Sequence, residues 1–216
     1  MPVRISLRVG SKASPFREML HRLITSIRGG EVYLCSGYIW QPCQAGTCLG
    51  SYSVLDDKLL QALMRAAPAR IVTIAGKLDY PIWQLGYRNF VLSLKKHFKN
   101  VDAYIAPRRN WHAKIAIRLN EHGEPIAGLV GSSNLTRPAY GLNSRKWNFE
   151  ADVLIWIPDS KFNKIFGSPY EAFDNQRLLG DLHLLLDASK NQYSEFEQLR
   201  KLREYVMESG LKRFDV

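Results

Sequence analysis

Two short polar motifs lie close together in the middle of the chain. The first runs from His112 to Lys114 (His-Ala-Lys), and the second runs from Gly131 to Asn134 (Gly-Ser-Ser-Asn) and is followed by Leu-Thr. Together they supply an imidazole, an ammonium, hydroxyls and an amide. A neutral imidazole is a nucleophile, and the other groups donate hydrogen bonds to phosphate oxygens. The two motifs therefore predict a site that attacks and holds a phosphodiester without a metal ion.

The strand predicted over 112–119 places His112 beside Lys114. Side chains alternate between the two faces of a strand. One face then carries the apolar residues Ala113, Ile115, Ile117 and Leu119. The other carries His112, Lys114, Ala116 and Arg118. Two neighbouring cations repel, which favours the neutral, nucleophilic form of His112. By itself a His-x-Lys sequence is common and fits an ordinary edge-strand pair.

The second motif lies at the end of the next predicted strand, 125–131, where a glycine allows the chain to turn. Ser132 and Asn134 can both donate to phosphate oxygens there. A helix N-cap formed by the same residues is an alternative that is compatible with this role. The sequence has neither the Gly-x-Ser-x-Gly of serine hydrolases nor a Gly-x-x-x-x-Gly-Lys phosphate loop, and it predicts no cofactor.

A carboxylate, Glu150, opens the last strong predicted strand, 150–157, in the sequence Asn-Phe-Glu. A single carboxylate at the start of a strand is usually on the surface. Near a histidine it can instead orient the imidazole and set its tautomer.

Periodicity predicts strands that alternate with helices. The predicted strands are 5–9, 31–40, 70–75, 101–106, 112–119, 125–131 and 150–157. One predicted helix begins at Ser14-Pro15, and two more cover about 53–66 and 82–98. The segment 160–216 is expected to be mostly helical, with a charged amphipathic part over about 190–210. We expect one α/β domain over residues 1–216, with a mixed, mostly parallel sheet flanked by helices on both faces.

The order of these motifs resembles the phospholipase D superfamily: His-x-Lys, then Gly-Ser-x-Asn-Leu-Thr, then Asn-x-Glu at the head of a hydrophobic strand. The resemblance covers residues 100–157 by motif, and the order of elements extends it to the whole chain. Within the superfamily, the Ser-Ser-Asn-Leu-Thr sequence and the small size of the chain are most similar to the bacterial nuclease branch, which includes the catalytic domains of some metal-independent restriction endonucleases. The fold that this resemblance implies is phospholipase D-like.

The resemblance implies a role for each matching residue. His112 would be the nucleophile that forms a phosphohistidine, and Glu150 would hold its imidazole. Lys114 and Asn134 would bind the phosphoryl oxygens, assisted by Ser132. One position departs from the pattern, because the family usually has Asp five residues after the lysine and this chain has Leu119.

Superfamily enzymes use two copies of the motif, and this chain has one. Transfer through a phosphohistidine needs a nucleophile on one side of phosphorus and a general acid at the leaving oxygen on the other. The remaining histidines lack the motif. We therefore expect a homodimer in which two chains complete one active site.

The formal net charge of +10 favours a polyanionic partner, with nucleic acid ahead of an anionic membrane. Basic and aromatic residues near the motifs are predicted to contact nucleic acid: Arg108, Arg109, Trp111, Arg137, Arg145 and Lys146. Lys95, Lys96 and Lys99 precede them in the chain and are expected in the same groove. A solvated basic face with tryptophans in the core is the alternative interpretation.

Composition places the chain among cytoplasmic globular proteins. Its N-terminus has no apolar segment typical of a signal peptide, and no apolar run is long enough to span a bilayer. Three cysteines, Cys35, Cys43 and Cys48, form an odd set that argues against a disulfide framework and for reduced thiols. A zinc site at Cys43 and Cys48 would need two more ligands.

The resulting hypothesis is a metal-independent nuclease that acts on DNA in preference to RNA. A separate specificity or helicase-type partner would fit, because the chain has no room for a domain that reads sequence. Two alternatives remain. One is a phosphatidyl hydrolase or transferase that uses the same residues, and the other is a nucleic-acid-binding subunit without catalytic activity.

Overall fold

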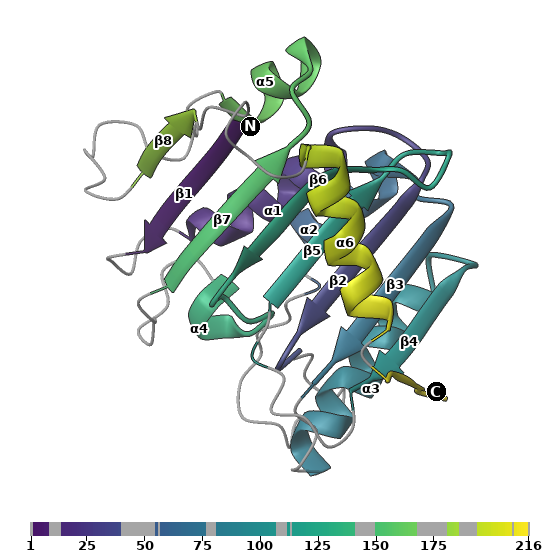
Figure 1. Ribbon diagram of the computed structural model, residues 1–216. Coiled ribbons are helices and arrows are strands. Elements are labelled where there is room, and N and C mark those ends of the chain that lie inside the picture. The colour runs from purple at the N-terminus through teal and green to yellow at the C-terminus, as the bar shows by residue number, and fades with distance from the viewer. Residues whose placement is uncertain are drawn as a thin grey trace.

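A mixed β-sheet of nine strands runs through the part of the chain that the computed structural model describes. The described residues are 2–8, 14–39, 55, 57–76, 81–106, 112, 114–140, 150–167, 181–185, 194–208 and 210–215. The strands are β1 (Pro2–Arg8), β2 (Glu31–Ser36), β3 (Arg70–Ala75), β4 (Val101–Ile105), β5 (Lys114–Leu119), β6 (Pro125–Gly131), β7 (Glu150–Trp156), β8 (Asp181–Leu185) and β9 (Lys212–Arg213). Their order across the sheet is β8-β1-β7-β6-β5-β2-β3-β4-β9 (Figure 1).

The sheet is mixed, as predicted, but most of its strand pairs are antiparallel. Only β2 with β3 and β3 with β4 are parallel. The other pairs of neighbours are antiparallel. The expectation of a mostly parallel sheet is therefore wrong. Among the described neighbouring strands, only β2 with β3 and β3 with β4 are joined by a helix that returns the chain in the same direction, whereas β5 and β6 form a hairpin, whose strands are antiparallel.

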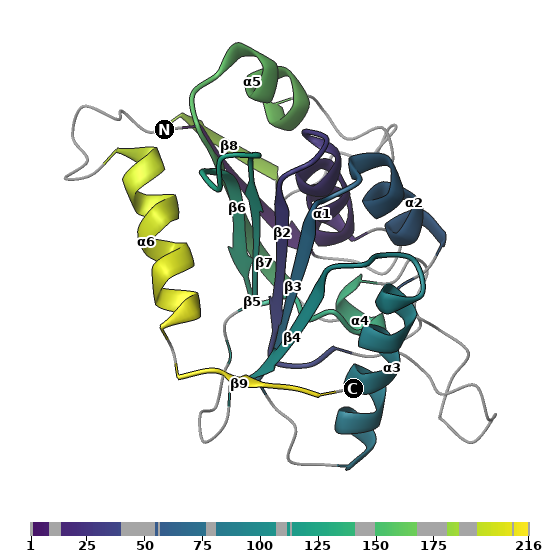
Figure 2. The same cartoon turned by 90° about the vertical axis from the view of Figure 1, so that its right-hand side faces the viewer.

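Helices cover both faces of the sheet, which confirms the predicted α/β class. The helices are α1 (Pro15–Thr25), α2 (Asp57–Ala66), α3 (Pro81–Lys95), α4 (Arg137–Tyr140), α5 (Ser160–Gly167) and α6 (Glu195–Met207). Figure 2 shows α1 to α5 on one side of the sheet and α6 on the other. Below, these are called the α1 face and the α6 face.

Local signals in the sequence place several of these elements. Ser14 caps α1 and accepts a hydrogen bond from the amide of Arg17 at 3.3 Å, and Pro15 follows at the first helical position, as expected. Strands β3 and β6 have the predicted bounds. Two strands, β8 and β9, were not predicted, so the segment 160–216 is not wholly helical. β9 has two residues, too few for any periodic signal.

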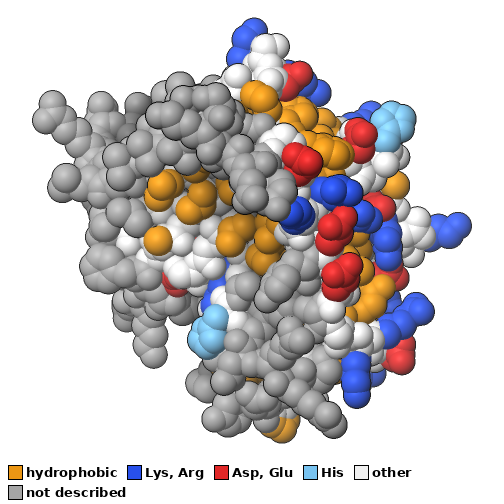
Figure 3. All heavy atoms as spheres, viewed as in Figure 1, with side chains coloured by type: hydrophobic (Ala, Val, Ile, Leu, Met, Phe, Trp, Pro, Cys, Tyr) orange, Lys and Arg blue, Asp and Glu red, His pale blue; other side chains and the backbone are white. Residues whose placement is uncertain are grey.

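The main core lies on the α1 face, where Leu20, Leu23 and Phe90 are fully buried. A smaller core lies under α6, where Ile117 packs with Val206. Acidic and basic side chains alternate on the visible surface of α6 (Figure 3). Within this helix Arg200 and Glu204 form an ion pair at 3.8 Å. This mixture fits the solvated amphipathic helix that its sequence suggests.

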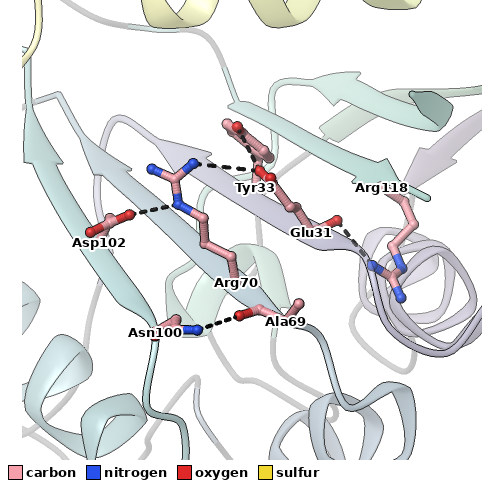
Figure 4. A network of polar contacts seen from close by, with 7 residues as sticks. All are labelled: Glu31, Tyr33, Ala69, Arg70, Asn100, Asp102 and Arg118. Atoms are coloured by element: carbon pink, nitrogen blue, oxygen red, sulfur yellow. Dashed lines mark hydrogen bonds and ion pairs between the residues drawn. The ribbon is translucent and has the colours of Figure 1, made fainter. Parts of the chain in front are cut away.

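A polar network holds the end of the sheet at which β2 and β3 begin (Figure 4). Arg70 donates from Nε to Asp102 at 2.6 Å and lies 3.7 Å from Glu31. Arg118 is fully buried and donates to backbone carbonyls, including those of Glu31 and Gly29. The guanidinium of Arg118 thus joins β5 to β2 and to the end of α1. The polar side chains of the motifs lie at the other end of the sheet.

Candidate functional site

The two motifs and Glu150 meet where three adjacent strands begin or end. Lys114 is the first residue of β5, Gly131 is the last residue of β6, and Glu150 is the first residue of β7. In the ladder Lys114 lies opposite Gly131, and Gly131 lies opposite Asp152. Strand order therefore brings residues separated by up to 38 positions into one row beside α4 (Figure 1).

His112 and Lys114 have different environments. His112 is exposed and precedes β5, whereas Lys114 is only 8% exposed. The predicted start of the strand at 112 is therefore wrong by two residues. Within β5 the predicted parity is confirmed, because Ile115 and Ile117 belong to the core under α6 while Ala116 packs in the core of the α1 face. An accessible imidazole next to a buried ammonium suits attack on a bound anion.

Ser132 and Glu150 form a hydrogen-bonded pair. Ser132 Oγ donates to Oε2 of Glu150 in a short contact, and it accepts from the backbone N–H of Ala151 at 3.0 Å. Glu150 is 7% exposed. The hydroxyl can donate only one hydrogen bond, and in this arrangement it donates that bond to the carboxylate. Ser132 therefore holds Glu150 in place, and it would have to rotate before it could donate to a phosphate.

Asn134 is fixed by its oxygen. Its Oδ1 accepts from the backbone N–H of Tyr38 at 3.1 Å and lies 3.2 Å from the hydroxyl of Ser36, which is 2.6 Å from the carbonyl oxygen of Tyr38. The same hydroxyl accepts from the N–H of Leu135 at 3.1 Å. Because the Tyr38 amide needs an acceptor, these contacts orient Asn134 so that Nδ2 points away from Tyr38. The half-buried amide can present two N–H donors to an anion.

Two residues at this end were missed from the sequence. Ser133 donates from Oγ to Oδ2 of Asp152 at 2.6 Å, and its backbone N–H donates to Oδ1 at 3.2 Å. Asp152 is 2% exposed. A signal was present, because Asp152 lies two positions after Glu150 and so shares its face of a strand that is otherwise apolar.

Gly131 makes room for the Asp152 carboxylate. A Cβ atom at position 131 would overlap Oδ1 of Asp152 and would lie 2.6 Å from the carbonyl oxygen of Ala151. The carboxylate therefore occupies the space over Gly131, toward β5. Burial raises the pKa of Asp152 to about 6, while the hydrogen bonds from Ser133 and the charge of Lys114 oppose that rise.

The residues predicted to contact nucleic acid are only partly placed. Arg108, Arg109, Trp111, Arg145 and Lys146 lie outside the described residues. Arg137 begins α4, directly after the second motif and its Leu-Thr extension.

Lys95, Lys96 and Lys99 do not join the motifs, which corrects the expectation from the sequence. They lie at and just beyond the end of α3, next to the start of β4, where Val101 pairs with Ile71. That end of the sheet is opposite the motifs. Nearness along the chain was misleading here, because α3 runs back along the length of the sheet before β4 begins.

Two other sequence expectations concern single positions. Leu119, where the phospholipase D pattern has Asp, is fully buried in the core under α6. Cys35 is a buried free thiol whose pKa is raised by burial, whereas Cys43 and Cys48 are outside the described residues. No cluster of three or more metal-binding side chains occurs among the residues that the structure describes. In the same residues no helix is long and apolar enough to cross a membrane.

The fold and the site together define an α/β protein with a cluster of polar side chains at the ends of β5, β6 and β7. No known family profile matches the sequence, and no curated protein matches it. Several solved structures are similar to the chain. A phosphatidylserine synthase of Haemophilus influenzae Rd KW20 has 13% identity and a TM-score of 0.48 over 95% of this chain and 45% of its own.

Two other similar structures match a smaller share of this chain. NucT from Helicobacter pylori has 16% identity and a TM-score of 0.38 over 70% of this chain and 84% of its own. A yeast tyrosyl-DNA phosphodiesterase has 17% identity and a TM-score of 0.42 over 70% of this chain and 45% of its own. The chain thus spans less than half of the synthase and of the yeast enzyme.

Proposed function

We propose that this protein is a metal-independent phosphodiesterase that cleaves nucleic acid through a phosphohistidine on His112. One observation carries the proposal: the strand ends bring Lys114, the Ser132–Glu150 pair and Asn134 into one site, next to an exposed imidazole. The positive charge of the chain and the nuclease and DNA phosphodiesterase among the similar structures support nucleic acid as the substrate, with DNA ahead of RNA.

The residues have distinct tasks in the first step. A nitrogen of neutral His112 attacks phosphorus, and the bond from phosphorus to the leaving oxygen breaks. Lys114 and Nδ2 of Asn134 donate to the non-bridging oxygens, whose negative charge increases in the transition state. Glu150, held by Ser132, orients the imidazole and stabilises its positive charge as the N–P bond forms.

The leaving oxygen needs a proton, and a second imidazole on the opposite side of phosphorus would donate it. We assign this role to His112 of the partner subunit in a homodimer. In the second step the partner's His112 accepts a proton from water, the water oxygen attacks phosphorus, and the N–P bond breaks. The product is a phosphate monoester, and both histidines return to their starting state.

Cleavage of DNA in excess EDTA tests the function. The wild type should cut plasmid and single-stranded DNA in EDTA, and a ³²P-labelled substrate should leave an acid-labile, base-stable label on the protein. His112→Ala should lose both activities. His122→Ala is a matched control, since His122 is exposed in the β5–β6 turn at the far end of the strands. A strict requirement for Mg²⁺, or cleavage that persists in His112→Ala, would refute the proposal.

The same preparation tests the two alternatives. Headgroup release from phospholipid vesicles without cleavage of DNA would indicate the phosphatidyl hydrolase or transferase. DNA binding without cleavage and without a protein-bound label would indicate a non-catalytic subunit.

A further inference from the structure

Asp152 is a buried carboxylate that the proposed reaction does not yet use. Its side chain is 2% exposed and accepts two hydrogen bonds from Ser133. Both Oδ atoms therefore have partners from the turn that carries Ser132 and Asn134. Through these bonds Asp152 fixes the backbone of the second motif at a point between its two donors.

The carboxylate also faces Lys114. Lys114, Gly131 and Asp152 form one row across β5, β6 and β7, and residues in such a row share a face of the sheet. Gly131 has no side chain, and the Asp152 carboxylate fills the space that a Cβ atom would need. Nothing from β6 therefore stands between the carboxylate and the long side chain of Lys114 along this row. The charge of Lys114 lowers the pKa of Asp152, although burial, the Ser133 hydrogen bonds and Glu150 affect that pKa more.

The buried ammonium of Lys114 needs an anionic partner. It is 8% exposed, and burial disfavours an ammonium unless an opposite charge lies close by. Other charged groups near the pair are Glu150 on β7, Arg8 opposite Glu150 on β1, and His112 before β5. From the α1 face, Arg17 of α1 lies over the ring of Tyr140 in α4. Asp152 and Glu150 are the anions among these groups, and Glu150 accepts a hydrogen bond from the hydroxyl of Ser132.

We infer that Asp152 is a positioning residue of the phosphate site, which holds the Ser132–Asn134 turn through Ser133 and keeps the Lys114 ammonium charged before substrate binds. The inference rests on the proposed function for its catalytic consequence. Its electrostatic part concerns only this chain and can be measured without any substrate.

The central test compares Asp152→Asn with the wild type. Asparagine keeps the shape and an acceptor for Ser133 but removes the charge. We expect the pKa of the Lys114 ammonium, followed by NMR, to fall by about one unit or more, because Lys114 then loses its proton more readily. Inhibition by inorganic phosphate should weaken at pH values between the two pKa values of Lys114, where the variant has lost the ammonium and the wild type retains it. Asp215→Asn is the matched control, since Asp215 is 92% exposed and should change neither quantity.

A second variant separates the two tasks of Asp152. Ser133→Ala removes a hydrogen bond and leaves the charge, so kcat/KM should fall while the pKa of Lys114 stays unchanged. If Asp152→Asn lowers activity with no fall in the pKa of Lys114 and no loss of phosphate inhibition, Asp152 is only a structural residue and the inference is wrong.

NMR of Lys114 makes the result independent of activity, and its wild-type titration does not depend on the folding of any variant. The ¹³Cε and ¹Hε signals of Lys114, assigned with Lys114→Arg, should respond in the wild type to a titration near pH 6, where Asp152 ionises. They should also show a lower pKa for Lys114 in Asp152→Asn. If the Lys114 signals change neither with the titration near pH 6 nor in Asp152→Asn, the inference is wrong even if the enzyme is active. If the protein has no nuclease activity but the Lys114 signals respond to both changes, only the proposed function is refuted.

Discussion

Ser132 donates a hydrogen bond from its hydroxyl to Glu150, so the second motif and the head of β7 are already coupled without substrate. The same oxygen accepts from the N–H of Ala151, which leaves the hydroxyl little freedom to rotate. Matching to the motif pattern assigns Ser132 to the phosphate, whereas the geometry assigns it to the carboxylate that orients the nucleophile. The two assignments predict different behaviour of variants.

A double-mutant cycle distinguishes these roles. If Ser132 acts through Glu150, Ser132→Ala and Glu150→Gln should each reduce kcat, by about 10²-fold for the glutamate, and the double variant should be no worse than Glu150→Gln. KM should change little in Ser132→Ala. Independent effects whose free energies add, or a rise in KM for Ser132→Ala alone, would show that Ser132 binds the phosphate directly. Ser194→Ala, at the exposed N-cap of α6, is a control for loss of a serine hydroxyl.

Asn134→Asp isolates the donor function of the amide. Aspartate retains an oxygen to accept from the N–H of Tyr38, so we expect a melting temperature within a few degrees of the wild type. It removes the N–H donors and adds a negative charge beside the phosphate, so kcat/KM should fall by about 10²-fold to 10³-fold. Ser36→Ala is the structural counterpart, because it loses the contacts to Asn134 and Leu135 and should lower the melting temperature more than Asn134→Asp does. An active Asn134→Asp would remove the amide from the mechanism.

The extent to which the sequence predicts this site follows from which interactions are local. The start of α1 depends on Ser14 and Pro15, and the bounds of β6 depend on its own apolar run, so both are predicted correctly. The parity of β5 is likewise a property of the strand alone. The role of Asp152 depends on a neighbour across the sheet, because only the register places it over Gly131. The prediction that Lys95 lies near the motifs is wrong for the same reason, because a position in the chain does not reveal which end of the sheet that residue reaches.

The pH dependence of stability should reveal the cost of burying Asp152. Its pKa is raised from 3.8 to about 6 in the folded protein, so the folded state binds a proton more tightly than the unfolded state. Stability from this group is full below about pH 4 and is lost as pH rises through about 6. The difference corresponds to roughly 3 kcal/mol at most. Urea unfolding from pH 4 to 7.5 should therefore show the wild type losing stability relative to Asp152→Asn.

This result would connect stability with function. A variant that is more stable at neutral pH but less active is the expected signature of a group kept for the site at the expense of the fold. If instead Asp152→Asn is less stable than the wild type throughout this pH range, the hydrogen bonds from Ser133 outweigh the burial of charge, and the carboxylate stabilises the fold.

Mixed dimers test whether two chains share one active site. If each site needs His112 from both subunits, a dimer of one wild-type and one His112→Ala chain is inactive. After co-refolding at equal amounts, specific activity per wild-type chain should fall to about one half and total activity to about one quarter of an all-wild-type sample of the same total protein, because only wild-type pairs are active. Independent sites would leave about one half of that total. The control mixes wild type with His122→Ala, which should retain full activity, and sedimentation at the assay concentration should give twice the chain mass. Activity that is linear in the wild-type fraction, or a monomer mass at which cleavage persists, would contradict the shared site.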